Sequence, residues 1–406
     1  MSVAPASTGE TKETKTDPDP LYDLIIEESL AKNIYPKEKL NAARAAPHTS
    51  LCAQFVTEDV WNKYKDVVSS GPAKWTMARA INTGVMYPES FVGCHAGDAE
   101  SWDEFKDFFY PVIEAYHKGF SMEKGSGNLG SPSERLDPEK ISTDLSESAQ
   151  VKIISTRIRI ARNLVSFPLN PGGTVETRKQ VLELLRKVYN QFNDSEDDDL
   201  KGDLFEHETM SAEQRQGLVE DHFLFRGADK MQAASGYHVG WPVGRGVFHN
   251  REKTFVNWIN EGDHVRIISM RMGADVKGVF ALLAKGANAI EAGIKNITGN
   301  EEAYMMHPKF GAITCCPSNL GTGLRCSVHI VIPKLIKAWG FEKIDEECRK
   351  RMCQARGSSG EHSKVVDRVG ISNWRRIGIP EYLLIEDMIK CVNWIVEQED
   401  NISEDA

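Results

Sequence analysis

Two arginines stand two residues apart in the segment Val151-Lys-Ile-Ile-Ser-Thr-Arg-Ile-Arg-Ile. The alternating apolar residues are typical of a strand, so Arg157 and Arg159 should project from the same face. Adjacent guanidinium groups repel one another unless an anion lies between them, and phosphate matches their donor geometry bidentately. Two surface arginines, each paired with a separate carboxylate, would explain the segment equally well.

A glycine-bearing loop follows in the segment Cys316-Pro-Ser-Asn-Leu-Gly-Thr-Gly-Leu-Arg. It lies between two expected strands, Ile313–Cys316 and Cys326–Ile332, and its backbone N–H groups could bind an anion beside Arg325. The loop lacks the G-x(4)-G-K-[ST] pattern of a Walker A motif. Cys316 could be a low-pKa thiolate near these cations, or a small buried apolar residue.

Two further segments place charges near turns. Arg356-Gly-Ser-Ser-Gly-Glu-His is either a mobile loop that closes over a substrate or an ordinary surface loop. The sequence around Asn260-Glu-Gly-Asp brings Glu261, Asp263 and Arg266 to one turn, where they could equally be solvated charges. The H-R-D and D-F-G signatures of protein kinases are absent from the sequence. Together, the segments indicate arginine-rich binding of a polyphosphate without a Walker loop.

Composition narrows the class of protein. The chain has 406 residues and a formal net charge of −10, which argues against a general nucleic-acid or membrane-surface binder. Eight cysteines without zinc-finger spacing predict reduced thiols and an intracellular protein. The sequence has no apolar run of transmembrane length, and its first twenty residues resemble neither a signal peptide nor a mitochondrial presequence. We therefore expect a cytoplasmic protein.

The pattern of apolar residues predicts an α+β fold. A small all-helical domain should be followed by a larger catalytic domain, in which helices flank an antiparallel sheet, because strands and helices mix there without β-α-β alternation. The expected segments are a disordered tail at 1–20, the helical domain at 21–120, a linker at 121–147 and the catalytic domain at 148–406.

Individual elements follow from periodicity and capping. In the small domain, helical spacing recurs at 21–34 and 60–68, and again over Trp102–Tyr110, where Pro111 should end the helix. In the larger domain we expect strands at 151–160, 254–259 and 265–270, the last two as a hairpin, besides the two that flank the glycine loop. Helices are expected at 176–192, from the capping box that begins at Ser211, at 274–297 and after Pro380.

Five segments, in order along the chain, resemble the signatures of the phosphagen (ATP:guanido) kinase family. They are Ser155-Thr-Arg-Ile-Arg, Glu220-Asp-His-Phe-Leu-Phe, Asp263-His-Val-Arg-Ile-Ile-Ser-Met, Cys316-Pro-Ser-Asn-Leu-Gly-Thr-Gly-Leu-Arg and Arg356-Gly-Ser-Ser-Gly-Glu-His. The resemblance implies reversible, MgATP-dependent transfer of the γ-phosphoryl group to a guanidino nitrogen. It also implies that Mg²⁺ is held mainly by phosphates and water, so no protein metal-ligand cluster is expected.

The resemblance also assigns roles to residues. Cys316 and Glu361 correspond to the thiolate and carboxylate that contact the guanidinium. The residues implied to bind ATP are Ser155, Thr156, Arg157, Ile158, Arg159, His222, Arg266, Arg325, Cys326, Ser327, Val328, His329, Arg356, Gly357, Ser358, Ser359, Gly360 and Glu361.

One position departs from the family pattern. The family usually has Asn-Glu-Glu-Asp-His where this chain has Asn260-Glu-Gly-Asp-His. The second glutamate normally orients the guanidinium, and Gly262 cannot do so. Either Glu361 suffices, or Glu261 moves in, or activity is reduced.

The choice of guanidino substrate should depend on the segment Thr83-Gly-Val-Met-Tyr-Pro-Glu-Ser-Phe-Val-Gly-Cys-His. Its short loop resembles that of arginine kinases and favours L-arginine. Ser90, Phe91, Val92 and His95 match positions that contact the substrate, and Tyr116 is also arginine-kinase-like. Because a histidine at position 95 could face a sulfonate, taurocyamine or another guanidine stays open, and packing alone could explain the loop residues.

The expected function is therefore a phosphagen kinase that binds ATP or ADP and a small guanidino compound, as a monomer or homodimer. A weakly active or inactive nucleotide-binding paralogue, disabled at Gly262, is the second hypothesis. A kinase of protein arginines is the third, although the small helical domain argues against it.

Overall fold

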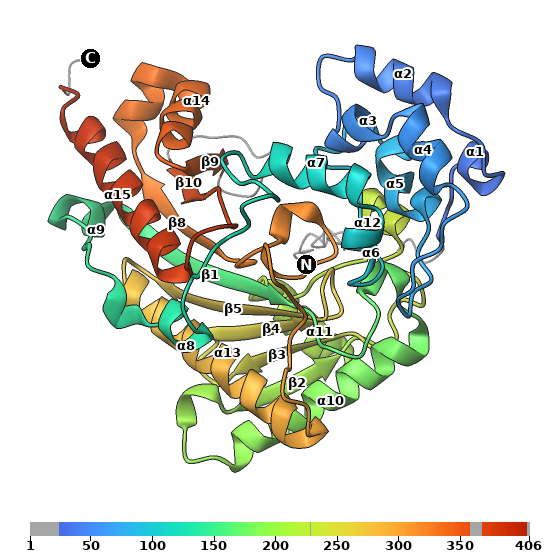
Figure 1. Ribbon diagram of the computed structural model, residues 1–406. Helices are drawn as coiled ribbons and strands as arrows, with labels where there is room; N and C mark the ends of the chain where they lie inside the picture. Colours follow the sequence, from blue (N-terminus) through green and yellow to red (C-terminus); the bar gives the residue numbers. More distant parts are fainter. Residues whose placement is uncertain (1–23, 228, 358–367, 404–406) are drawn as a thin grey trace, which may run out of the picture.

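The computed structural model describes residues 24–227, 229–357 and 368–403, so the tail predicted at 1–20 lies outside the described residues. An antiparallel sheet of eight strands crosses the middle of the molecule in the order β2-β3-β4-β5-β1-β8-β10-β9 (Figure 1). Its strands are β1 (Ile153–Arg162), β2 (Gly202–Glu206), β3 (Gly246–Asn250), β4 (Phe255–Ile259), β5 (Val265–Met272), β8 (Arg325–Val331), β9 (Cys353–Gly357) and β10 (Arg368–Asn373). A separate small sheet pairs β6 (Met306–His307) with β7 (Gly311–Ala312).

Helices cover one face of the sheet, because alternate strand residues such as Ile158 and Ile160 are fully buried there. In Figure 1, α10 and α13 lie below the sheet, and α14 and α15 lie at the upper left. Gly286 on α13 allows close contact, since a Cβ there would lie 2.2 Å from the Phe255 ring. The helices of this part are α8 (Pro132–Arg135), α9 (Glu147–Lys152), α10 (Val175–Asp194), α11 (Ala212–Glu220), α12 (Lys230–Ser235), α13 (Val276–Thr298), α14 (Pro333–Lys350) and α15 (Glu381–Asp400).

Short helices form the N-terminal part, at the upper right of Figure 1. Ser50, Thr57 and Thr76 each accept a backbone N–H bond at a helix N-terminus, which explains why the helices begin there. Their core is aromatic and includes the fully buried Trp102 and Phe108. These helices are α1 (Glu28–Ala31), α2 (Lys37–Ala45), α3 (Leu51–Phe55), α4 (Glu58–Tyr64), α5 (Met77–Met86), α6 (Ser101–Glu104) and α7 (Lys106–Tyr116). The α+β class predicted from the sequence is thus confirmed.

Three local predictions are wrong. The helical spacing at 21–34 yields only the one-turn helix α1 among the described residues, and Ile25 and Ile34 are exposed. Pro111 lies inside α7, where burial of the flanking Phe108 and Val112 outweighs the proline's missing donor. Ile313–Cys316 is not a strand, because its backbone bonds scattered partners rather than one neighbouring strand.

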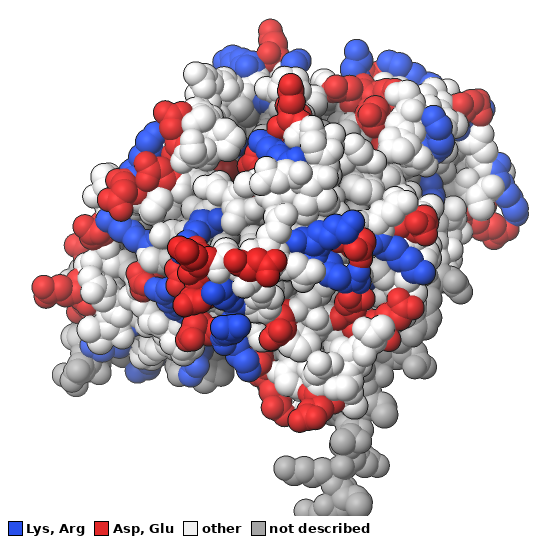
Figure 2. All heavy atoms as spheres, turned by 90° about the horizontal axis from the view of Figure 1, so that it is seen from below, with Lys and Arg blue, Asp and Glu red and all other residues white. Residues whose placement is uncertain are grey.

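The segment 121–147 packs against the sheet-bearing part rather than spanning open solvent. Leu136 and Ile141 are buried in its core, and Ser142 donates a backbone and a side-chain hydrogen bond to Glu386. On the molecular face shown in Figure 2, basic and acidic side chains are interspersed. Among the described residues, no helix combines the length and apolarity needed to cross a membrane.

Candidate active site

Strand register brings the predicted arginines onto one face of the sheet. Arg159 on β1 pairs with Arg325 on β8, and Ala161 pairs with Arg266 on β5. Directly paired residues of antiparallel strands share a face, and so do residues two apart on one strand. Arg157, Arg159, Arg266 and Arg325 therefore project from the face opposite the helix-covered core, and each is half-buried.

The same face extends across β8 to β9. Gly370 on β10 lies between its two partners, His329 on β8 and Arg356 on β9. His329 Nδ1 is 3.0 Å from Ser155 Oγ, which orients the imidazole beside β1. We call the five residues Arg157, Arg159, Arg266, Arg325 and Arg356 the arginine face.

Cations on this face repel one another. Burial, followed by the charges of Arg266, Arg157 and Arg325, lowers the pKa of Arg159 well below its usual value. Burial and then Arg266 lower the pKa of Arg157 to about 10. A bound polyanion would relieve this repulsion, so the geometry suits a triphosphate.

Tryptophan and two carboxylates support the arginine face. Arg157 and Arg266 lie 5.7 and 5.6 Å from the Trp258 ring. Arg266 also forms an ion pair of 2.9 Å with Glu261. Although burial opposes its charge, Glu261 and Asp263 raise the pKa of Arg266.

Strand alternation points four of the predicted ATP-binding residues away from this face. Ile158, Cys326 and Val328 are buried in the helix-covered core, and the buried Thr156 donates its hydroxyl to Gly273 O at 2.9 Å. These residues could meet a nucleotide only through backbone atoms. Ser327, by contrast, shares the face and donates to Arg157 O at 3.1 Å.

His222 follows α11 in an exposed position with a left-handed backbone, φ 59°. The next residue, Phe223, accepts a hydrogen bond of 2.7 Å from Trp258 Nε1. Trp258 also contacts Arg157 and Arg266, so the backbone that follows His222 is bonded to a residue of the arginine face's surroundings.

Cys316 is half-buried at the start of the glycine loop, with its Sγ 3.1 Å from Ser318 Oγ. Burial raises the pKa of this thiol, although Ser318 and Arg376 oppose the shift. The thiolate that the family resemblance implies stays a prediction, because a bound guanidinium would favour the charged form of the thiol.

Arg376 holds the glycine loop in place. Its guanidinium donates to Leu324 O at 3.2 Å, to Asn319 Oδ1 at 3.0 Å and to Ser318 O. Thr322 N donates in return to Arg376 O at 2.9 Å. Arg376 itself is buried, so it fixes the loop between Cys316 and Arg325 from within the protein.

A second network positions the segment before the loop. Asn163 Nδ2 donates to Asp263 Oδ1 at 2.7 Å and to Ile313 O at 3.0 Å. Cys315 N donates to the same Asp263 oxygen at 3.1 Å. Backbone bonds from Ile313 N to Met305 O and from Ala96 N to Cys315 O complete the network, which sets Cys316 beside the β4–β5 turn.

Gly262 lies in that turn beside Tyr237. A Cβ at Gly262 would lie 3.4 Å from Tyr237 Cε2 and 3.7 Å from Arg266 Nη2, which is ordinary van der Waals contact. The neighbouring Glu261 is nearly buried, paired with Arg266 and hydrogen-bonded by Gln232 at 3.2 Å. Moving Glu261 toward a substrate would therefore break both interactions.

The predicted specificity segment divides into exposed and buried residues. The Phe91 side chain is 70% exposed, with its ring 5.8 Å from that of Tyr116. Val92 is buried in the helical core, so its side chain faces away from solvent. Ser90 is also buried, and its Oγ has no hydrogen-bond partner among the described residues.

His95 connects this segment to the β4–β5 turn. Its ring lies 5.4 Å from that of Tyr237, whose hydroxyl is 2.7 Å from Cys315 Sγ. Burial lowers the pKa of His95 to about 4, so the imidazole is neutral at pH 7.

Sequence reasoning missed Arg376, Tyr237 and Asn163, none of which belongs to a segment that suggested chemistry. The one sequence feature that could have indicated a role for Arg376 was the pair Arg375-Arg376, which lies between a strand and a helix. Gly357 is buried at the end of β9, whereas Ser358, Ser359, Gly360 and Glu361 lie outside the described residues.

Comparison with protein families decides the classification. Residues 46–114 match the N-terminal domain of ATP:guanido phosphotransferases, and residues 183–402 match their C-terminal catalytic domain. The chain belongs to the ATP:guanido phosphotransferase family. It is accordingly a phosphotransferase with a guanidino acceptor.

Relatives of this guanido phosphotransferase include the arginine kinase of Stichopus japonicus, which is 39% identical over 354 residues, or 87% of this chain and 90% of the relative. The arginine kinase of Callinectes sapidus is 37% identical over 357 residues, or 86% of this chain and 92% of the relative.

Two solved structures are similar to this guanido phosphotransferase. A structure titled as lombricine kinase has a TM-score of 0.77 at 31% identity, over 88% of this chain and 95% of that one. The duplicated taurocyamine kinase of Schistosoma mansoni has a TM-score of 0.78 at 31% identity, over 90% of this chain. The chain spans about half of that duplicated protein, 49% of its length.

Proposed function

We propose that the protein catalyses reversible transfer of the γ-phosphoryl group of MgATP to L-arginine. The observation that carries the proposal is the arginine face, to which β1, β5, β8 and β9 contribute five arginine side chains. The arginine kinases among its relatives support L-arginine as the acceptor.

In the proposed reaction, the arginine face binds the triphosphate and stabilises the charge of the transferring phosphoryl group. A guanidino nitrogen attacks the γ-phosphorus; the new N–P bond forms as the bond to the β,γ-bridging oxygen breaks. Cys316 and Glu361 orient the guanidinium, and a carboxylate accepts the proton that the nitrogen loses. ADP leaves with the bridging oxygen.

Magnesium would accompany the nucleotide in this proposal. The described residues contain no group of three His, Cys, Asp or Glu side chains placed to hold a metal ion, and an arginine face suits a metal held by phosphates and water. Bound with ATP, Mg²⁺ would neutralise part of the phosphate charge.

Taurocyamine is the alternative acceptor, since a histidine at position 95 could face its sulfonate. A panel of arginine, taurocyamine, lombricine and creatine with MgATP tests the proposal, with ADP release and ³¹P NMR as the measurements. Phosphorylation of arginine above the others is expected. Preference for another guanidine would refute L-arginine as the substrate. Transfer only to added protein substrates would indicate a protein-arginine kinase. No transfer to any acceptor would refute the assignment of kinase activity.

We also propose a role for Cys316 in orienting the substrate, and Cys316→Ala tests it. We expect kcat to fall ten- to a hundredfold, because charged orienting contacts contribute about that much, whereas stability should change by about 1 kcal/mol or less. Cys315→Ala is the matched control. Cys315 is fully buried against Tyr237 and Asp263, so its loss should lower the melting temperature more. Unchanged kcat in Cys316→Ala would show that its thiol is only structural.

A weakly active paralogue is the second candidate function, favoured by Gly262 and by the engagement of Glu261 with Arg266. If a carboxylate is missing, Gly262→Glu should raise kcat/KM by about tenfold or more, since positioned acid–base groups contribute at least that. A Cβ at Gly262 meets only ordinary van der Waals contacts. Gly262→Gln, which matches the shape without the charge, should give no gain. Wild-type turnover equal to that of an arginine kinase would end this alternative.

A further inference from the structure

A cavity of about 200 Å³ lies away from the arginine face. The segment around α8, the C-terminal end of β1 and helix α13 line it. Arg162 is the last residue of β1 and follows Ile158 and Ile160 at a spacing of two residues. Its side chain therefore lies on the same face of the sheet as theirs, opposite Arg157 and Arg159. The cavity is thus separate from the proposed phosphate site.

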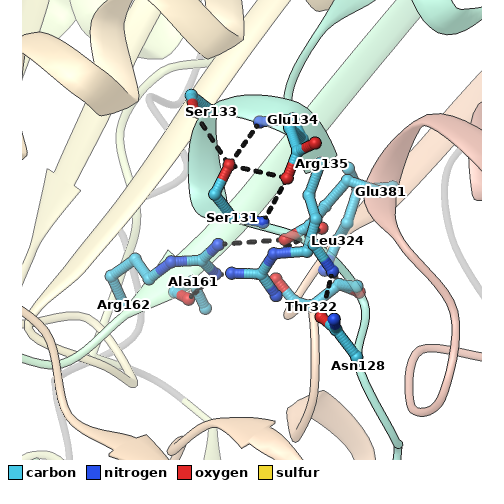
Figure 3. Close-up of polar contacts among 11 residues, drawn as sticks. Asn128, Ser131, Ser133, Glu134, Arg135, Ala161, Arg162, Thr322, Leu324 and Glu381 are labelled. Carbon is cyan, nitrogen blue, oxygen red and sulfur yellow. Dashed lines mark hydrogen bonds and ion pairs between the residues drawn. The ribbon is translucent and has the colours of Figure 1, made fainter.

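Two buried arginines reach this cavity. In Figure 3, Arg135 descends from α8, and its guanidinium lies beside that of Arg162 near the carboxylate of Glu381. The Arg135 side chain is only 9% exposed and that of Arg162 only 7%. Both line the cavity, whereas Glu381 is fully buried behind them.

Arg162 is well satisfied but Arg135 is not. Arg162 Nη1 donates to Ala161 O at 2.9 Å and to Thr322 O at 2.6 Å, and its Nη2 lies 3.4 Å from Glu381 Oε1. Arg135 Nε is 3.8 Å from Glu381 Oε2, beyond hydrogen-bond distance, and neither atom has a hydrogen-bond partner among the described residues. Glu381 thus balances Arg162 closely and Arg135 only at a longer distance.

Charge at the inner end of the cavity points to an anion. Two guanidinium groups there face the single carboxylate of Glu381, which leaves one positive charge unbalanced. The negative charge of Glu291 is already balanced by Lys295, with which it forms an ion pair of 2.7 Å nearer the surface. Glu302, the other carboxylate of the lining, belongs to an exposed residue.

The rest of the wall is largely apolar. Leu136, Ala303 and Tyr304 are buried lining residues, and Met306 is half-exposed beside them. A volume of about 200 Å³ is below that of pockets for drug-sized ligands, so the occupant must be small.

We propose that this cavity binds a small monocarboxylate with a short branched apolar chain. Its carboxylate accepts hydrogen bonds from Arg135, with Arg162 alongside, and its apolar chain packs on Leu136 and Tyr304. Guanidinium and carboxylate form charge-assisted, bidentate pairs, which suits a ligand with one negative charge.

The test uses 4-methylpentanoate as the probe and titration calorimetry as the measurement, with the full chain saturated with MgADP so that the arginine face is occupied. Saturable binding is expected, weakened at least tenfold in Arg135→Gln. The neutral 4-methylpentanamide should bind at least tenfold more weakly than the carboxylate. Arg349→Gln, which removes a partly exposed arginine from α14, is the matched control and should bind as the wild type does.

Stability separates this proposal from a purely structural ion pair. Without ligand, Arg135→Gln should melt at or above the wild-type temperature, because it removes a poorly satisfied buried charge while Arg162 keeps Glu381 paired. Met306→Trp, which fills the mouth and leaves the charges intact, should also abolish binding. Absence of binding, equal binding of the amide, full binding by Arg135→Gln, or a lower melting temperature of that variant without ligand would overturn the proposal.

Discussion

Arg159→Met is expected to lower kcat by a factor of about 10²–10³ while raising the melting temperature of the ligand-free protein. The loss of rate follows from the proposed role of Arg159 on the arginine face, since a preorganised group that stabilises transition-state charge contributes about that factor. The gain in stability has a separate cause. Arg159 is surrounded by Arg157, Arg266, Arg325 and other cations, and its removal relieves their repulsion.

The gain should be about 0.5–2 kcal/mol, as is common when a strained functional residue is replaced. MgADP should stabilise the wild type more than the variant, because the nucleotide replaces repulsion with ion pairs. Arg271→Met provides the control on the same sheet. Arg271 is partly exposed and paired with Asp275, so neither kcat nor stability should change appreciably. Unchanged turnover in Arg159→Met, or a lower melting temperature, would contradict the arginine face as a phosphate site.

The sequence could identify part of this face but not its assembly. Arg157 and Arg159 follow from strand alternation alone, because a spacing of two fixes a common side. The approach of Arg266 and Arg325 depends on strand order and register, which pair β1 with both β5 and β8. Such pairings between distant segments are not encoded in local periodicity, so only the family resemblance linked Arg266 and Arg325 to the first two.

Strand alternation could also have excluded residues from side-chain contact with ATP. Thr156 and Ile158 alternate with the arginines on β1, so their side chains had to face the core once the opposite face carried the cations. The same holds on β8 for Cys326 and Val328.

The error at Ile313–Cys316 has a different origin. An apolar run before a glycine loop reads as a strand, but Asp263 and Asn163 bond its backbone from distant parts of the chain. A strand requires one continuous neighbouring backbone as partner, whereas this segment divides its bonds between those side chains and single backbone groups of Met305 and Ala96. Local sequence carries no trace of such a partner.

Arg376→Met should lower both stability and turnover, in contrast to Arg159→Met. Arg376 is buried and donates to Ser318 O, Asn319 Oδ1 and Leu324 O, so its removal takes a donor from each of these acceptors, of which Leu324 O keeps Asn373 Nδ2. The expected loss is about 3 kcal/mol, since several charge-assisted bonds disappear together. The glycine loop then loses the contacts that fix Cys316 and Arg325, and a misplacement of about 1 Å can cost about a hundredfold in kcat.

The adjacent arginine supplies a matched control for this prediction. Arg375 has a side chain that is 37% exposed and an ion pair with Asp387 at 2.7 Å, so Arg375→Met should change stability by about 1 kcal/mol at most. Thermal unfolding and steady-state kinetics, measured below the variant's melting range, separate the two effects. If Arg376→Met kept its kcat while losing stability, the loop would be positioned by the rest of its contacts. A stability unchanged from the wild type would instead mean that the buried carbonyls find other donors, and the assignment of Arg376 as the residue that holds the loop would fail.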